Sequence, residues 1–297
     1  MADLRGRAAI VTGAGKGLGR AYALELARCG AQVLVNNRRH PDEPDDRTSA
    51  QQTVDAIRAN GGVAFANWCD VTAADSGHAM VEQVRGQFGR LDIIVANAGI
   101  DAAGSFHKQS LDEFRAVFDT GFLGNLHLAH AAWPHLVRQG YGRVILTTSS
   151  AGLYGNHGQA AYSAAKAAVI GLTRALAIEG KRHGVLVNAI APYAYSQLTA
   201  PYMTTEMARQ FDPALVAPLV AWLASADCDI SGEILVSGAG MVRRAGVGEG
   251  QALALAEPIG QLVRALRDQA LHSHANANDS FSGFLEELDQ HTRAGTV

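Results

Sequence analysis

Short runs of apolar residues, rich in valine and isoleucine, alternate along the chain with longer stretches in which apolar residues recur at helical spacing. The apolar runs cover 8–12, 32–36, 63–67, 91–96, 143–148 and 185–190. The helical stretches lie near 17–29, 48–60, 76–88, 111–139 and 160–181. Strands that are apolar on both faces are typical of a parallel sheet covered by helices on each side. The alternation therefore predicts an α/β, doubly wound (Rossmann) fold. A helix near 214–224 and a strand near 233–236 would complete a seven-stranded sheet.

No linker interrupts residues 1–240, and the Pro- and Asp-rich segment 40–48 is interpreted as a connection between a strand and a helix. The pattern of apolar and polar residues changes after Gly240. A glycine-rich stretch is followed by an amphipathic helix around 257–271, the polar residues 272–280 and a short helix around 281–292. We expect 1–240 to form a single Rossmann-type catalytic domain. The C-terminal helical extension, 241–297, is too small for a core of its own and should pack on the domain or on a neighbouring subunit.

Composition narrows the classes of partner. The 297 residues include 48% hydrophobic residues and carry a net charge of −3 without any basic block, which argues against a nucleic-acid partner. The three cysteines, Cys29, Cys69 and Cys228, are far apart, and the histidines show no metal-ligand pairing, so we expect reduced thiols and no metal. The N-terminus has no signal-peptide layout and no apolar run is long enough to span a bilayer, which predicts a cytoplasmic protein with no membrane partner.

The first strand runs into a glycine-rich turn, TGAGKGLG at 12–19, which opens the first helix. Gly13, Gly17 and Gly19 remove side chains that would block both the turn and the approach of a pyrophosphate to the free N–H groups of the helix. Lys16 and Leu18 lie in the same turn. A glycine-rich turn can also be a mere tight connection, but its position between strand and helix predicts dinucleotide binding.

The end of the second strand decides which dinucleotide is preferred. An acidic residue there would bind the ribose 2′-hydroxyl and repel a 2′-phosphate. This chain has Asn37 followed by Arg38, a guanidinium suited to phosphate, and Lys16 could add a second positive charge. Two solvated arginines, Arg38 and Arg39, are the alternative interpretation. We expect NADP(H) to be preferred, with NAD(H) as the second option.

The segment 147–172 contains the residues that point to catalysis. Tyr162 and Lys166 are four residues apart on a predicted helix and share a face, and Ser149 follows the fifth strand at the sheet edge where α/β folds bind ligands. An ammonium beside a phenol lowers a pKa that is ordinarily about 10, as a tyrosine acid/base requires. A Tyr/Lys pair is by itself an ordinary surface feature; the upstream serine and the nucleotide turn favour chemistry.

With these residues the chain resembles the short-chain dehydrogenase/reductase family over roughly 4–240. It also has Asp70-Val71 after the third strand and the tripeptide Asn97-Ala98-Gly99. The resemblance implies that Asp70 contacts adenine, that the tripeptide supports the centre of the sheet, and that all five of these positions adjoin the cofactor. It also implies that Tyr162 is the acid/base, that Ser149 orients the substrate and that Lys166 binds the nicotinamide ribose.

A closer resemblance is to the dehydrogenase part of the peroxisomal multifunctional enzymes of type 2, which are (3R)-hydroxyacyl-CoA dehydrogenases, and to their bacterial single-domain relatives. The matching segments are 17–27, 131–144, 152–172, 216–225 and 234–242, and the extension also fits. This implies a small-molecule substrate, a 3-hydroxyacyl thioester or a steroid alcohol of similar shape. It also implies a homo-oligomer, a tetramer or a dimer.

Two departures from the family pattern stand out. Gly121 occupies the position at which many members have an Asn that holds a relay water, and Asn125 follows one turn later. Tyr193 follows Pro192 where a glycine is common, and the loop from Tyr193 to Met207 is predicted to be a substrate lid. Within it Ser196 or Thr199 could hold the nicotinamide carboxamide. Pro192 and Ser196 are therefore counted among the cofactor-binding residues.

The leading hypothesis is reversible hydride transfer between nicotinamide and a secondary alcohol or ketone. Within enzymes, a hydroxysteroid dehydrogenase and a 3-oxoacyl carrier-protein reductase are the alternatives. From another class, the alternative is a nucleotide-sensing protein that has kept the fold and lost turnover. The intact set of Ser149, Tyr162 and Lys166 argues against the sensor, and Gly121 argues for it.

Overall fold

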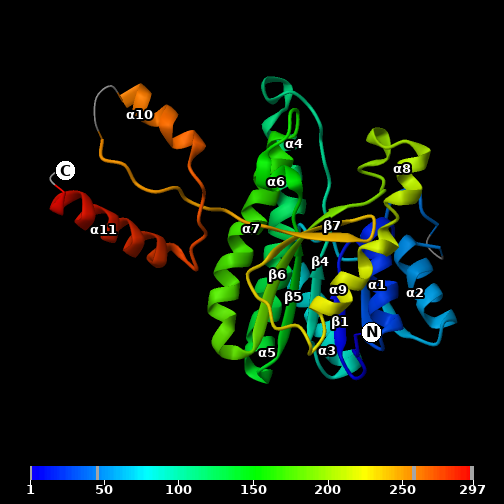
Figure 1. Cartoon of the computed structure of the whole chain (residues 1–297). Coiled ribbons are helices and arrows are strands. Elements are labelled where there is room, and N and C mark those ends of the chain that lie inside the picture. The colour runs from blue at the N-terminus through cyan, green and yellow to red at the C-terminus, as the bar shows by residue number, and fades with distance from the viewer. Residues whose placement is uncertain (1, 45–46, 256–258, 295–297) are drawn as a thin grey trace. The chain divides into compact units, whose positions relative to one another are not determined.

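The structure, a computed structural model, describes residues 2–44, 47–255 and 259–294 (Figure 1). Internal contacts divide the chain into two compact units, Met1–Arg244 and Ala245–Val297. The first unit contains the sheet and is described first, and the second unit is described by itself.

The sheet of the first unit has the strand order β3-β2-β1-β4-β5-β6-β7-β8. Its strands are β1 (Ala8–Val11), β2 (Gln32–Asn36), β3 (Val63–Asn67), β4 (Ile93–Ala96), β5 (Gly142–Thr147), β6 (Val185–Tyr193), β7 (Ile234–Gly238) and β8 (Met241–Ala245). Six parallel pairings join β1 to β7, which confirms the seven parallel strands of a doubly wound fold. The eighth strand was not predicted. It follows a turn with positive φ at Ala239 and Gly240, and its largely exposed sequence, MVRRA, does not alternate apolar and polar residues as a strand would.

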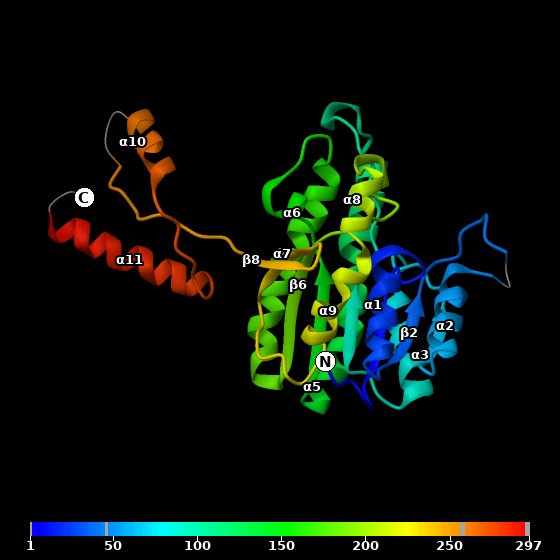
Figure 2. The ribbon, with the colours of Figure 1, turned by 45° about the vertical axis from the view of Figure 1, so that its right-hand side comes forward.

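Helices cover both faces of this sheet (Figures 1 and 2). They are α1 (Gly17–Arg28), α2 (Ser49–Ala59), α3 (Ser76–Phe88), α4 (Leu111–Phe118), α5 (Gly124–Gln139), α6 (Ser150–Tyr154), α7 (Ala160–Gly180), α8 (Thr205–Gln210) and α9 (Ala217–Leu223). Ala9 and Val11 of β1 pack into a core with α1, α2 and α9. Ala8 and Ile10 pack into a second core with α3, α5 and α7. Successive side chains of a strand point to opposite faces, so one apolar strand supplies both cores.

The helix predicted over 111–139 is interrupted. A π-helical turn, Asp119–Leu123, separates α4 from α5, with the buried Gly121 at its centre. The side-chain amide of Asn125 donates to the Gly121 carbonyl over 2.9 Å. A wider turn leaves carbonyls without their usual helical partners, and a side chain can satisfy one of them. The apolar periodicity persists through the break, which is why the sequence pattern predicts one helix.

One helical stretch within the described residues, Ala160–His183, is long and apolar enough to cross a membrane by length and composition alone. In the structure 39% of its most apolar window is buried. Val169 and Ala177 of this stretch belong to the second core, and Lys166 is 2% exposed. The stretch is thus the core-covering helix α7 together with the short turn that follows it.

The second unit contains α10 (Ile259–Ala265), a short turn, Leu266–Asp268, and α11 (Ala277–Arg293). A β-bridge between Glu249 and His272 and a contact of 3.3 Å between the Glu249 carboxylate and the His274 ring hold its loops together. The helix predicted near 257–271 is shorter, and residues 256–258 lie outside the described part. The last helix begins four residues before its predicted start because Asn276 caps it, accepting from the Asp279 backbone N–H over 3.0 Å.

Candidate active site

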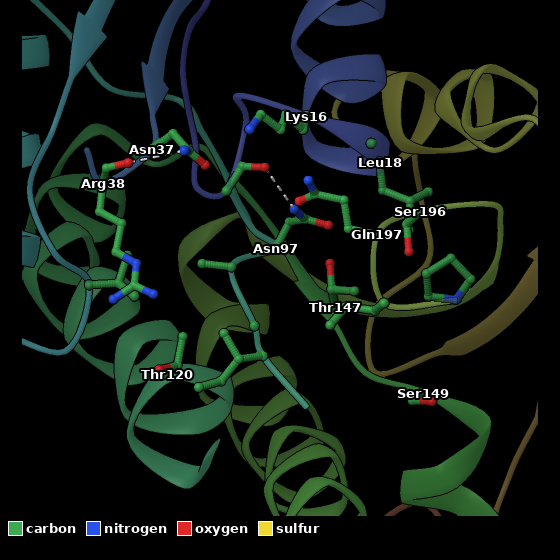
Figure 3. Close-up of a pocket in the computed structure, with 18 of the residues that line it drawn as sticks. Lys16, Leu18, Asn37, Arg38, Asn97, Thr120, Thr147, Ser149, Ser196 and Gln197 are labelled. Carbon is green, nitrogen blue, oxygen red and sulfur yellow. Dashed lines mark hydrogen bonds between the residues drawn. The ribbon is translucent and has the colours of Figure 1, made fainter. Parts of the chain in front are cut away.

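A cavity of about 310 Å³ lies where the loops leave the carboxyl ends of the parallel strands (Figure 3). Every cofactor-binding and catalytic residue predicted from the sequence lines it, except Gly19. The predicted residues that line it are Gly13, Lys16, Gly17, Leu18, Asn37, Arg38, Asp70, Val71, Asn97, Ala98, Gly99, Ser149, Tyr162, Lys166, Pro192 and Ser196. The parallel strand order brings these distant segments to one edge, as in other doubly wound sheets.

The glycine turn has the conformation that its sequence predicts. Gly13 and Gly17 adopt positive φ values of 63° and 52°, a region that favours glycine. Gly19 does not line the cavity, and it is needed for packing because a Cβ there would lie 2.2 Å from the carbonyl oxygen of Gly13. The turn therefore brings the backbone at the start of α1 close to the cavity, where N–H groups can hold an anion.

Thr12 and Asn97 tie β1 to β4 at the floor of the cavity. The Thr12 hydroxyl accepts from the backbone N–H groups of Asn97 and Ala98 over 3.0 and 3.1 Å. The Asn97 side chain donates back to the Thr12 carbonyl over 3.1 Å. Asn97 thus supports the centre of the sheet, as the family resemblance implies. A Cβ on Gly99 would lie 3.4 Å from the Lys166 ammonium, so this backbone passes close to the lysine.

The residues after β2 and β3 form the other end of the cavity, away from Ser149 in Figure 3. The Asn37 side chain donates to the Ser49 hydroxyl over 3.0 Å. The Arg38 guanidinium lies 3.8 Å from the Asp70 carboxylate, and both are about half exposed. Asp70 also accepts from the Thr72 backbone N–H over 2.9 Å. The structure brings the two predicted determinants of cofactor choice, Asn37 and Arg38, together with Asp70.

Glu43 is a nearby residue that the sequence reasoning missed. Its carboxylate lies 3.2 Å from the Lys16 ammonium and accepts from the Ser49 backbone N–H over 3.0 Å. Lys16 therefore already has an anionic partner. Nothing in the sequence pattern marks Glu43, since it lies in the acidic connection 40–48, which was interpreted only as a loop.

The catalytic candidates lie at the opposite end. Ser149 caps α6, and its hydroxyl accepts from the Ala151 backbone N–H over 3.2 Å. Its hydroxyl is also close enough to Tyr162, in the first turn of α7, to favour a lower pKa of that phenol. Lys166, one turn later, donates to the Thr147 carbonyl over 2.8 Å, with its ammonium 5.8 Å from the centre of the Tyr162 ring. The three predicted side chains thus meet at one wall of the cavity.

The expected lowering of the Tyr162 pKa is not found. Burial raises the pKa of the phenol above its ordinary value of 10.0, the hydrogen bond with Ser149 opposes this rise, and the charge of Asp101 adds to it. Burial also lowers the pKa of Lys166 to about 8. The spacing alone predicts the opposite effect on the tyrosine. A prediction from spacing does not include the free-energy cost of burying a phenolate. Nor does it include the orientation of the Lys166 ammonium toward the Thr147 carbonyl.

Asp101 is a second residue that the sequence reasoning missed. Its carboxylate accepts from the Gln159 side chain, and its other oxygen is buried without a hydrogen-bond partner among the described residues. It follows the motif Asn97 to Gly99 by two positions, beyond the part that the motif defines. A carboxylate at this distance in sequence gives no signal of its proximity to Tyr162, which only the fold creates.

The segment after β6, which the sequence predicts to be a substrate lid, begins with a tight turn. The Thr199 hydroxyl accepts from the Ser196 backbone N–H over 2.8 Å and donates to the Ala194 carbonyl over 2.7 Å. Thr199 therefore holds the turn, and Ser196 is the better placed of the two for a ligand. Both line the cavity together with Gln197 and Leu198. The helix α8 that follows was not predicted, and it lies at the same edge of the sheet in Figures 1 and 2.

The residues that are present fit a nicotinamide dinucleotide. The glycine turn adopts backbone conformations that exclude larger residues, and the other end of the cavity offers Lys16, Asn37 and Arg38. Near Lys166, the buried Thr147 hydroxyl lines the cavity and has no hydrogen-bond partner among the described residues. Among the residues that the structure describes, no group of three or more His, Cys, Asp or Glu side chains is placed to hold a metal ion.

Known proteins resemble this chain in sequence, and a solved structure resembles it in fold. A short-chain type dehydrogenase/reductase of Mycobacterium tuberculosis is 39% identical over 246 residues, which cover 82% of this chain and 86% of that protein. The peroxisomal multifunctional enzyme type 2 of Mus musculus is 41% identical over 239 residues, or 80% of this chain and 32% of the relative. The solved structure of the full-length Drosophila melanogaster enzyme of that name matches with a TM-score of 0.82 at 32% identity. It covers 97% of this chain and 50% of the solved one.

The chain thus spans a third to a half of the length of these multifunctional enzymes, and most of the length of the bacterial relative. The family model described as short chain dehydrogenase matches residues 7–210, which include the glycine turn, Ser149, Tyr162 and Lys166. On this match and these identities, the chain belongs to the short-chain dehydrogenase/reductase family of NAD(P)-dependent oxidoreductases.

Proposed function

We propose that the protein interconverts a 3-hydroxyacyl thioester and the corresponding 3-oxoacyl thioester, with NADP(H) as the preferred cofactor. The observation that carries the proposal is the wall of the cavity formed by Ser149, Tyr162 and Lys166. It occurs in a chain 41% identical to part of a peroxisomal multifunctional enzyme type 2. The wall supplies the acid/base chemistry, and the likeness supports the substrate class.

In the proposed reaction the chain's residues hold the substrate oxygen and move one proton. Ser149 donates to that oxygen, and Tyr162 exchanges its phenolic proton with it. Lys166 holds the nicotinamide ribose beside them. The nicotinamide supplies or accepts the hydride when bound. Because burial raises the pKa of Tyr162, the phenol is neutral near pH 7, which is the form that donates a proton during ketone reduction.

The substrate class can be tested with matched compounds. We expect oxidation of (3R)-hydroxybutyryl-CoA and no comparable oxidation of the (3S) isomer, measured by nicotinamide absorbance. Steroid alcohols and 3-oxoacyl carrier-protein thioesters, run under the same conditions, cover the two alternative enzyme activities. Turnover of a steroid with none of any thioester would contradict the proposed substrate, and absence of all turnover would favour the nucleotide sensor.

The preference for NADP(H) rests on Asn37, which removes the carboxylate that repels a 2′-phosphate, and on Arg38 beside it. We expect calorimetric titration to give tighter binding of NADP(H) than of NAD(H). Arg38→Asp should reverse the order, because a carboxylate there accepts from a ribose hydroxyl and repels phosphate. Equal or tighter binding of NAD(H) by the unaltered protein would contradict the preference.

A further inference from the structure

Glu43 occupies a group of anion-binding donors at the end of the cavity away from Ser149. One carboxylate oxygen accepts from the backbone N–H of Ser49 over 3.0 Å and from its hydroxyl over 3.3 Å. The other oxygen lies 3.2 Å from the Lys16 ammonium. The Glu43 side chain is only 12% exposed although it belongs to a surface loop. A carboxylate held by an ammonium, a hydroxyl and a helical N–H is bound as a small anion would be.

These donors are continuous with the cofactor cavity. Lys16, Asn37 and Arg38 line its end, as Figure 3 shows, and Asn37 donates to the same Ser49 hydroxyl over 3.0 Å. The backbone of the glycine turn packs directly against Ser49, since a Cβ on Gly15 would lie 2.4 Å from the Ser49 hydroxyl. The donors that hold Glu43 are therefore neighbours of the residues that are expected to decide between NADP(H) and NAD(H).

The Glu43 carboxylate is ionised in this setting. Burial alone would raise its pKa, but hydrogen bonds from Ser49 and Lys16 outweigh that effect and lower the pKa below its ordinary value. A negative charge thus neutralises the Lys16 ammonium. A phosphate brought to the same donors would meet this carboxylate, and two anions that share one set of donors repel each other strongly.

We propose that Glu43 is an internal anion that competes with the 2′-phosphate of NADP(H) for Lys16 and Ser49, and so limits the preference for NADP(H). The inference rests on the proposed binding of NADP(H) and adds a residue that opposes it. Asn37 and Arg38 admit the phosphate, whereas Glu43 weakens its binding. NAD(H) has no 2′-phosphate and leaves the pair between Glu43 and Lys16 undisturbed.

The test compares Glu43→Gln with the unaltered full-length chain, using two fragments that differ only in the 2′-phosphate. Calorimetry measures the affinity for ADP and for 2′-phospho-ADP. Removing the competing charge should raise the affinity for 2′-phospho-ADP by roughly tenfold and change that for ADP by less than about twofold. Asp42→Asn is the matched control, since it removes the same charge from an exposed neighbour in the same loop. It should leave both affinities within about twofold.

The ratio of the two affinities separates the outcomes. An unchanged or weaker affinity of Glu43→Gln for 2′-phospho-ADP would overturn the inference, and so would an equal gain produced by Asp42→Asn. Binding of ADP by the variant shows that its cavity is intact. If the unaltered protein binds NAD(H) more tightly than NADP(H), only the proposed cofactor preference is refuted. The inference about Glu43 still stands in that case if Glu43→Gln shifts the affinity ratio toward 2′-phospho-ADP.

Discussion

Tyr162 lies among groups that act on its phenol in opposite directions. Burial and the charge of Asp101 favour the neutral form of the phenol, whereas the nearby Ser149 hydroxyl favours the phenolate. The Lys166 ammonium donates to the Thr147 carbonyl and lies 5.8 Å from the centre of the Tyr162 ring. Near pH 7 the site therefore has a neutral tyrosine and a protonated lysine, the combination that an acid catalyst of ketone reduction needs.

We expect Tyr162→Phe to lower turnover by about 10²–10⁴-fold, because it removes the proton donor to the substrate oxygen. Cofactor affinity should change little, since the proposed function assigns the binding of the nucleotide to the glycine turn and Lys166. Steady-state rates and calorimetric titration of the cofactor measure the two effects separately.

Tyr141→Phe is the control for this substitution. The Tyr141 hydroxyl bonds to the Ala224 carbonyl over 3.3 Å, at the end of β5 opposite to the cavity, so the same loss of a hydroxyl should leave turnover unchanged. A Tyr162→Phe variant with more than roughly a tenth of the normal activity would show that another group supplies the proton.

Burial of Lys166 makes stability depend on pH. Its pKa is lowered from 10.5 to about 8, so the unfolded chain binds the proton more tightly and the folded protein is penalised below pH 8. The penalty disappears as the pH rises from about 8 to 10.5. The unfolding free energy of the unaltered protein should therefore rise over this window relative to Lys166→Met, by at most about 3 kcal/mol. Urea unfolding at a series of pH values measures the difference, and a constant difference would contradict the shift.

At the scale of elements, a single glycine allows the helices α3 and α5 to approach each other closely. The helices α3 and α5 pack against each other on one face of the sheet, and Gly77 lies at their contact. A Cβ there would lie 2.2 Å from the His127 carbonyl oxygen, whereas one on Gly86 of the same helix would meet nothing within 4 Å. The sequence shows two similar glycines in one helix, and only the packing distinguishes them.

This difference predicts opposite effects of one substitution within α3. Gly77→Ala should lower the unfolding free energy by roughly 1–3 kcal/mol, because backbone atoms of α5 must move apart. Gly86→Ala should raise it by about 0.5–1 kcal/mol, since alanine restricts the unfolded chain and favours the helix. Denaturant unfolding of both variants provides the comparison. Equal destabilisation by the two alanines would contradict the packing of α3 on α5.

At the scale of the whole molecule, several large apolar side chains on helices of the first unit face solvent. Ile178 of α7 is 55% exposed and Leu111 of α4 is 73% exposed. The described part of the second unit contains no buried residue, and its helices expose Phe281, Phe284 and Leu285. Exposed apolar surface of this kind is typical of association between subunits.

We propose that the protein is a homo-oligomer, most simply a tetramer, in which α7 and the interrupted helix α4–α5 form contacts between copies. Light scattering at micromolar concentration should give a mass several times the 31.2 kDa of one chain. Ile178→Asp should shift the mass downward, because it places a charge on the proposed contact. A mass of 31.2 kDa for the unaltered protein would contradict the proposal.

The sequence by itself determined the features that are local in the chain. The strands β1 to β7 and the helices α1, α2, α3 and α7 follow from the apolar pattern within their own segments, because the backbone repeat sets which side chains share a face. The glycine turn and the Tyr162–Lys166 spacing were likewise predictable, since the chemistry of each needs residues that are close in sequence. The parallel order of the strands then accounts for their meeting with Ser149 at one edge.

The tertiary structure alone decided what depends on distant neighbours. The break at Gly121 leaves the periodicity intact, and the pairing of Glu43 with Lys16 joins residues that no motif relates. The direction of the Tyr162 pKa depends on burial, Ser149 and Asp101 together. The free energy of a charge in a protein depends on how much water and which dipoles surround it, and these are fixed only when the chain is folded.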